Sequence, residues 1–130
     1  CDFRGFIEPE IVKRRPAVVI SPRSRHGSRL CTIVPLSTTA PLKPECWHYL
    51  LELNPPLPLP FDAPRCWVKG NTLYTVSHDR LDLPHKKDSA GKREYIKQLV
   101  SAKDLKAIRN CTIYGLGVDR LTVTTSGSTL

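Results

Sequence analysis

Residues 13–22 read Lys-Arg-Arg-Pro-Ala-Val-Val-Ile-Ser-Pro, so a basic cluster leads directly into a β-branched apolar run. Valine and isoleucine favour strands, which predicts a strand over residues 17–20. Pro16 has a fixed backbone angle and biases the residue before it toward extended conformations, which would hold Arg15 at the strand edge. An arginine on such a rigid element suits a phosphate, although a charge run beside a strand also commonly does no more than solvate a surface.

Similar apolar runs, separated by Pro, Gly and Ser, follow at residues 30–34, 46–53, 66–68 and 72–76. Eleven of the 12 prolines lie between Pro9 and Pro64, which disfavours helices in the first half of the chain. Short strands at this spacing are typical of a small barrel or a strongly curved sheet. We expect residues 54–64, which contain five prolines, to form an extended surface loop.

The last third of the chain permits a helix, which we predict from about Ala102 to Tyr114. The serine just before it is followed three residues later by an aspartate, the spacing of a capping box, and apolar residues then recur at helical spacing. Gly115 or Gly117 would end the helix by taking a left-handed conformation.

Two other segments are predicted to lack regular structure. The stretch from His85 to Lys97 combines five lysines and arginines with a glycine, which indicates a mobile basic loop. Residues 118–130 are rich in Ser and Thr toward their end, and we expect a flexible C-terminal tail. Residues 1–117 would then form a single domain.

The composition limits the classes of function. The chain has 130 residues and a net charge of +8, which suits an anionic partner, either nucleic acid or an acidic protein. Its five cysteines are far apart and form no C-x-x-C pair, so we expect no metal site and no disulfides, but reduced thiols in the cytoplasm. No apolar run approaches the roughly 20 residues of a membrane span, which predicts a soluble protein. Methionine is absent even at position 1, so we expect the natural start to lie upstream.

A second stretch with chemical potential is Val-Pro-Leu-Ser-Thr-Thr at residues 34–39. It ends a predicted strand in three consecutive hydroxyl residues. Hydroxyls both donate and accept hydrogen bonds, so they can position a phosphate or a ribose 2′-hydroxyl. The alternative is local turn chemistry, because Ser and Thr readily bond to nearby backbone groups.

The order and spacing of these two stretches resemble the MazF/PemK family of toxin–antitoxin endoribonuclease toxins. The family pattern of a basic residue and R-P-A-V-V-[IL]-S-P is similar to Arg14–Pro22, and its later V-P-x-[ST]-T is similar to Val34–Thr38. Leu73–Val76, followed by Asp-Arg-Leu at residues 79–81, resembles the family's strand and short helix, and Ser101–Leu105 resembles its final helix. The resemblance covers most of the chain from residue 1 to residue 117.

The resemblance implies a β-rich α+β fold, a compact SH3-like barrel of short antiparallel strands with a C-terminal helix. It also implies a toxin, usually a homodimer, that cuts single-stranded RNA without a metal or other cofactor and is neutralised by a cognate antitoxin protein. By the same resemblance, Arg15 faces the scissile phosphate and Thr38 is the second catalytic residue. Ser37 would be their neighbour.

These residue types suit RNA cleavage in which the ribose 2′-hydroxyl attacks the adjacent phosphorus. The products are a 2′,3′-cyclic phosphate and a 5′-hydroxyl end, and the RNA supplies its own nucleophile. A fixed guanidinium and a hydroxyl would stabilise the charge that gathers on the phosphorane oxygens, each donor typically by about 3–4 kcal/mol. We therefore expect Arg15 and Thr38 to share one cleft.

Further residues are predicted to contact the RNA: Arg14, Ser37, Trp67, Lys69, Asn71 and Thr72. The family often has an acidic residue followed by Gln where this chain has Asn71 and Thr72, so this contact is expected to differ. Trp67 beside Lys69 would stack on a base, although an aromatic strand residue of a small barrel is more often part of the core.

Histidine offers another route to acid or base catalysis. His78 is the reserve candidate, because Asp79 next to it would favour its charged form, and the alternative is a surface histidine. Two other functions stay open at this point. One is a barrel that binds nucleic acid without cutting it, and the other is a toxin that inhibits a protein such as DNA gyrase.

Overall fold

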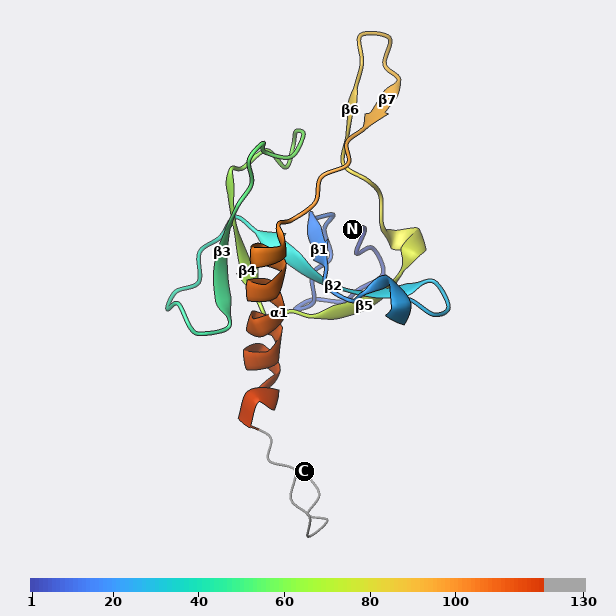
Figure 1. Cartoon of the computed structure of the whole chain (residues 1–130). Helices are drawn as coiled ribbons and strands as arrows, with labels where there is room; N and C mark the ends of the chain where they lie inside the picture. Colours follow the sequence, from blue (N-terminus) through green and yellow to red (C-terminus); the bar gives the residue numbers. More distant parts are fainter. Residues whose placement is uncertain (121–130) are drawn as a thin grey trace.

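The computed structural model describes residues 1–120 and contains one main sheet, a separate hairpin and one long helix (Figure 1). The strands of the main sheet are β1 (Ala17–Val19), β2 (Leu30–Ser37), β3 (His48–Glu52), β4 (Arg65–Lys69) and β5 (Tyr74–Ser77). The remaining elements are β6 (His85–Lys87), β7 (Arg93–Tyr95), α1 (Ala102–Leu116) and the 3₁₀ turns η1 (Arg23–Arg25), η2 (His78–Arg80) and η3 (Val118–Arg120). Within the predicted tail, residues 121–130 lie outside the described part.

The long strand β2 organises the sheet, because all its neighbours pair with it antiparallel. Ile33 lies opposite both Val19 of β1 and Tyr74 of β5, so β1 and β5 occupy opposite edges of β2. The edge of β2 that pairs with β5 also pairs, farther along, with β4, where Ser37 of β2 lies opposite Trp67 of β4. Strand β3 pairs with the other edge of β4. The predicted class, β-rich α+β with antiparallel strands and a C-terminal helix, is confirmed. Within residues 1–120 the pairings follow an open path that does not close into a ring.

Side chains on the two faces of β2 belong to two different apolar clusters, because successive side chains of a strand alternate between its faces. Val34 and Leu36 belong to the larger cluster, which also contains Ile108 of α1. Ile33 belongs to the smaller one, where Phe3 is fully buried. Burying a side chain of this size stabilises the fold by roughly 1.5–3 kcal/mol, so β2 contributes to both halves of the core.

Helix α1 begins where the sequence predicts and ends two residues later than expected. The Ser101 hydroxyl accepts a hydrogen bond from the Asp104 backbone N–H at 3.0 Å, which caps the first turn. Of the two candidate stop residues it is Gly117 that ends the helix, in the left-handed region with φ of 73°. Neither α1 nor the short turns within residues 1–120 have the length and hydrophobicity of a membrane span.

Gly115 serves a different purpose, since it allows α1 to touch the segment between β4 and β5. A Cβ on Gly115 would lie 2.5 Å from the backbone nitrogen of Asn71, and a Cβ on Gly70 would lie 2.1 Å from the carbonyl oxygen of Cys111. Both distances are far below van der Waals contact. The two glycines therefore permit direct backbone packing of α1 against the sheet.

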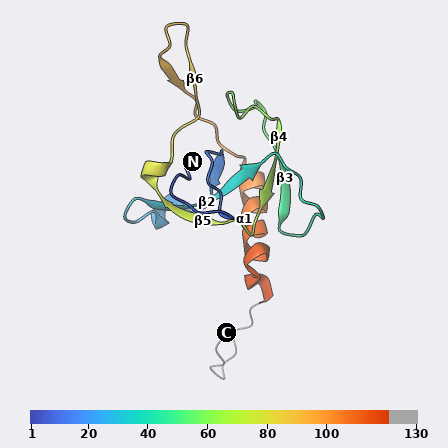
Figure 2. The ribbon, with the colours of Figure 1, turned by 180° about the vertical axis from the view of Figure 1, so that it is seen from behind.

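The basic stretch predicted as a loop is instead a hairpin, so that prediction was wrong. Strands β6 and β7 pair with Lys86 opposite Glu94, and the Asp88 carboxylate accepts hydrogen bonds at 2.9 Å from the backbone N–H groups of Ala90 and Lys92. This local turn organises the tip. In the views from both sides (Figures 1 and 2), the hairpin extends away from the body of the protein.

Replacing Gly115 with alanine tests the close packing of α1. Alanine is the better helix former by about 1 kcal/mol, yet the clash with Asn71 predicts a net loss of about 1–3 kcal/mol in the free energy of unfolding. Urea denaturation measures the change, and Asn110→Ala at an exposed position of α1 is the matched control. A Gly115→Ala protein as stable as the wild type would contradict the packing.

A second contact holds α1 to β3, and it predicts a pH dependence. The Tyr49 hydroxyl donates to the Asp104 carboxylate at 2.5 Å, and this bond raises the pKa of Tyr49 to about 12. The bond exists only while the phenol keeps its proton, so its contribution is complete below the ordinary value of about 10 and is lost as the pH approaches 12.

Tyr49→Phe should therefore lower the free energy of unfolding by about 1 kcal/mol at neutral pH. Above about pH 10 the difference between the two proteins should shrink, since only the wild type loses the bond there. Urea denaturation at a series of pH values checks this, with Tyr114→Phe at an exposed position of α1 as the control. A pH-independent difference would show that the hydrogen bond does not stabilise the fold.

Candidate active site

The backbone of Arg15 pairs with Cys1, and the backbone of the next residue, Pro16, pairs with β2. Directly after it, the carbonyl of Pro16 accepts a hydrogen bond from the backbone N–H of Leu36 at 2.8 Å, which extends the β1–β2 ladder by one step. The Arg15 N–H donates to the carbonyl of Cys1 at 3.1 Å, and the Cys1 nitrogen donates to the carbonyl of Arg15 at 2.7 Å. The expected placement of Arg15 at the edge of a strand thus has a structural basis.

The side chain of Arg15 is half-buried, and its Nε is fully enclosed. Within residues 1–120 this nitrogen has no hydrogen-bond partner. A buried N–H without an acceptor costs the fold roughly 1–3 kcal/mol. An arginine next to a proline at this position is suited to hold an anion.

The hydroxyl residues follow the end of β2. The Ser37 hydroxyl accepts a hydrogen bond from the backbone N–H of Thr39 at 3.1 Å, which is the turn chemistry considered as the alternative for this stretch. Thr38 is exposed. The register pairs Ala17 with Pro35, and continued by two and three residues it puts Arg15 across from Ser37 and residue 14 across from Thr38. Arg15 and Thr38 therefore belong to the same end of two adjacent strands, and their sharing of one phosphate stays a prediction.

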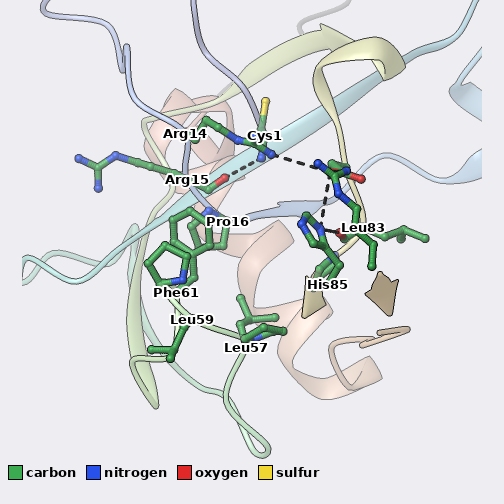
Figure 3. Close-up of a pocket in the computed structure, with 14 residues that line it drawn as sticks. Cys1, Arg14, Arg15, Pro16, Leu57, Leu59, Phe61, Leu83 and His85 are labelled. Carbon is green, nitrogen blue, oxygen red and sulfur yellow. Dashed lines mark hydrogen bonds and ion pairs between the residues drawn. The ribbon is translucent and has the colours of Figure 1, made fainter. Parts of the chain in front are cut away.

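A pocket of about 310 Å³ opens beside Arg15 (Figure 3). Its walls come from the segment Arg14–Pro16, from Leu57–Phe61 of the Pro-rich loop, and from the root of the hairpin at Asp82–His85 with Arg93. In Figure 3 Leu57 lies across from His85, whereas Leu59 and Phe61 lie farther from it. Among the catalytic and binding residues predicted from the sequence, Arg14 and Arg15 line this pocket, whereas Ser37 and Thr38 do not.

The other predicted RNA contacts lie along β4 and its following turn. Trp67 and Lys69 are both half-buried on β4. The Thr72 hydroxyl donates to the carbonyl of Lys69 at 2.6 Å and so takes part in the turn, while Asn71 is exposed. None of these four residues lines the pocket beside Arg15, so the structure does not gather all the predicted site residues in one cavity.

His78, the reserve acid or base, lies in η2 after β5. Its ring packs edge to face against His26, with 5.2 Å between the ring centroids. The Asp79 carboxylate accepts a hydrogen bond from the Arg29 guanidinium at 2.7 Å, so its charge is matched by Arg29. Arg29 therefore competes with His78 for the carboxylate of Asp79. Within residues 1–120, no group of three or more His, Cys, Asp or Glu side chains is arranged to hold a metal ion.

The sequence reading missed the three polar residues on the hairpin side of the pocket, Asp82, His85 and Arg93. The sequence shows the basic charge of residues 85–97, but these residues carry no pattern that predicts their pairing as β6 and β7. The pairing brings Arg93 back to the root of the hairpin, where it lies 3.3 Å from Asp82. Two prolines at positions 58 and 60 signal the extended loop opposite, yet no sequence pattern indicates that the loop faces the hairpin.

The Pro-rich loop packs on the larger apolar cluster through Leu57 and Ala63, and one side-chain hydrogen bond from outside the loop restrains it further. The Gln98 side-chain amide donates to the carbonyl of Pro55 at 2.7 Å. Gln98→Ala should let the loop open about fivefold more often, because such a bond is worth about 1 kcal/mol. Chymotrypsin reports this as faster cleavage after Phe61, since the bonds after Leu57 and Leu59 precede proline. Lys97→Ala is the control, and equal cleavage rates for all three proteins would show that Gln98 does not restrain the loop.

Comparison with known proteins agrees with the resemblance noted in the sequence. No curated protein matches the chain. A family model described as the PemK-like, MazF-like toxin of type II toxin–antitoxin systems matches residues 1–111, which include β1 to β7, the Arg15 segment and most of α1. The chain therefore belongs to the PemK-like, MazF-like toxins of type II toxin–antitoxin systems.

Proposed function

We propose that this protein is an endoribonuclease toxin that cuts single-stranded RNA without a metal ion. Toxins of its family are typically endoribonucleases. The observation that carries the proposal for this chain is Arg15, whose backbone N–H and carbonyl both bond to Cys1 and whose neighbour Pro16 is bonded to β2. Such an arginine is prepared to receive a phosphate oxygen.

In the proposed reaction the ribose 2′-oxygen bonds to the adjacent phosphorus while the bond to the 5′-oxygen of the next nucleotide breaks. The 2′-hydroxyl proton leaves, the departing 5′-oxygen gains a proton, and the products are a 2′,3′-cyclic phosphate and a 5′-hydroxyl. Arg15 neutralises the charge on the nonbridging oxygens, and the Thr38 hydroxyl orients the reacting phosphate. His78 is the reserve candidate for a proton transfer.

The remaining predicted contacts would guide the RNA strand toward this pair. Arg14 and Ser37 adjoin the catalytic residues in sequence, and Trp67, Lys69, Asn71 and Thr72 lie along β4 and the turn after it. The net charge of +8 supports binding to a polyanion. Trp67 would contribute by stacking on a base.

A cytoplasmic homodimer controlled by an antitoxin protein completes the proposal. Family membership implies the antitoxin partner. The end of α1 offers a surface for the second copy, since Ile113, Tyr114 and Leu116 are exposed apolar or aromatic residues on one short stretch. An exposed apolar stretch of this kind commonly marks a protein interface.

Cleavage of single-stranded RNA in excess chelator tests the proposed function. Arg15→Ala should reduce the rate about 100- to 1,000-fold, the usual loss when one donor to a developing oxyanion is removed. Thr38→Val should also reduce it, and the products should carry 2′,3′-cyclic phosphate ends. Arg65→Ala, which removes an exposed arginine from β4, is the matched control.

Two outcomes would overturn the assignment. Wild-type protein that binds RNA in a salt-dependent way but leaves it intact across varied sequences would indicate a nucleic-acid-binding protein without catalysis. Growth arrest that leaves cellular RNA intact and traps broken DNA would instead indicate a gyrase-type inhibitor. Equal activity of wild type and Arg15→Ala would exclude Arg15 from the chemistry.

A further inference from the structure

One carboxylate in the pocket beside Arg15 is surrounded by three basic side chains. Asp82 Oδ2 lies 3.3 Å from the guanidinium of Arg93, 3.7 Å from Nδ1 of His85 and 3.9 Å from the guanidinium of Arg14. Arg14 precedes β1, whereas the other residues belong to the hairpin and its root. The hairpin thus brings a second arginine to the segment that carries the proposed catalytic residue.

The charges in this cluster do not balance, since two arginines share a single carboxylate. Both arginine side chains are more than half exposed, at 56% for Arg14 and 52% for Arg93. Ion pairs at such exposure are weak and exchange readily with other anions. A phosphate group, with several acceptor oxygens, would satisfy the two guanidinium groups better than one carboxylate does.

The opposite wall of the pocket is apolar. It consists of Leu57, Leu59 and Phe61 with the prolines between them, and in Figure 3 Leu57 lies across from His85, whereas Leu59 lies farther from it. Leu59 is 78% exposed, so it is available to a ligand. A site for a free anion needs no such wall, whereas a nucleobase has a flat apolar face that packs well against it.

Hydrogen bonds from the segment after the hairpin hold the two walls in place. The Ile96 backbone N–H donates to the carbonyl of Pro84 at 2.7 Å and closes the root of the hairpin, while Gln98 donates to the carbonyl of Pro55 in the loop. Two residues only two positions apart therefore restrain both sides. The cavity of about 310 Å³ is at the small end of the range for ligand pockets, which suits a single nucleotide.

We propose that this pocket binds one unpaired nucleotide of the RNA, beside the position of the cut. The nucleotide's phosphate takes the place of Asp82 between Arg14 and Arg93, and its base packs on Leu57–Phe61. Asp82 is thus an internal competitor that neutralises the arginines while RNA is absent. The proposal rests on the proposed function for the identity of the polymer. Arg15 is a lining residue of this pocket, and in Figure 3 its guanidinium extends away from it, so the nucleotide bound here would adjoin the cut and not contact that group.

Binding of RNA that cannot be cut tests the pocket separately from catalysis. The probes are fluorescein-labelled 2′-O-methyl heptamers of A, C, G and U, which lack the attacking hydroxyl, with binding to the full chain followed by fluorescence anisotropy. Asp82→Asn should tighten binding about threefold, because it removes the competing charge. Arg93→Gln should weaken binding about fivefold, and Phe61→Ala about tenfold for the heptamer that binds best.

Matched variants separate the pocket from general charge effects. Glu94→Gln and Lys87→Gln change the same charges on the exposed hairpin outside the pocket, and each should alter affinity less than its counterpart at position 82 or 93. Inorganic phosphate as a competitor should lose affinity with Arg93→Gln but keep it with Phe61→Ala. Circular dichroism of each variant confirms that it is folded.

Three results would overturn the proposal. The first is an affinity unchanged by both Phe61→Ala and Arg93→Gln, and the second is weaker binding by folded Asp82→Asn. The third is displacement of the heptamers by an alternating Glu-Leu peptide at lower concentration than by unlabelled RNA, which would assign the pocket to an acidic protein. If the proposed function is wrong, the wild type will not cleave ordinary RNA in the cleavage assay. That result leaves these binding measurements unaffected, because the heptamers cannot be cut.

Discussion

Backbone contact between α1 and the turn after β4 is the constraint on which the rest of the structure depends. It exists because Gly70 and Gly115 leave room where any side chain would collide. The contact fixes the helix over β3 and β4, and Ile108 then completes the larger apolar cluster. It also holds the chain in a turn between β4 and β5, so that both strands lie along one edge of β2 while β1 takes the other.

The candidate site follows from this arrangement. With one edge of β2 occupied by β4 and β5, the entry to β1 lies next to the end of β2, where the continued register puts Arg15 across from Ser37. The proposed catalytic residues thus adjoin the regular pairing of β1 with β2, which is rigid. The adjoining pocket depends on the Pro-rich loop, which packs on the larger apolar cluster through Leu57 and Ala63, and on the hairpin, which within residues 1–120 pairs with no strand of the main sheet. We infer that chemistry and recognition are assigned to parts of the fold with different stability.

The sequence predicts those features that arise from local patterns. Strands over residues 17–20 and 30–34 and the helix after Ser101 could be found because β-branched runs and a capping residue act within a few positions. The hairpin at residues 85–95 was missed because its strands are charged and exposed, so they lack apolar alternation and are held by a turn around Asp88 instead. Asp82 and Arg93 could not be recognised as pocket residues, since their neighbours Arg14 and Phe61 are distant in sequence and meet them only in the fold.

The hairpin has one more consequence, which concerns how the protein can vary. Within residues 1–120, β6 and β7 pair with each other and with no strand of the main sheet. A change in the length of the tip between Lys87 and Arg93 therefore leaves both apolar clusters intact, while the root with Asp82 keeps its place through the bond from Ile96 to Pro84. Insertions at this tip offer a route by which related chains could acquire new surface without renewed adjustment of the core.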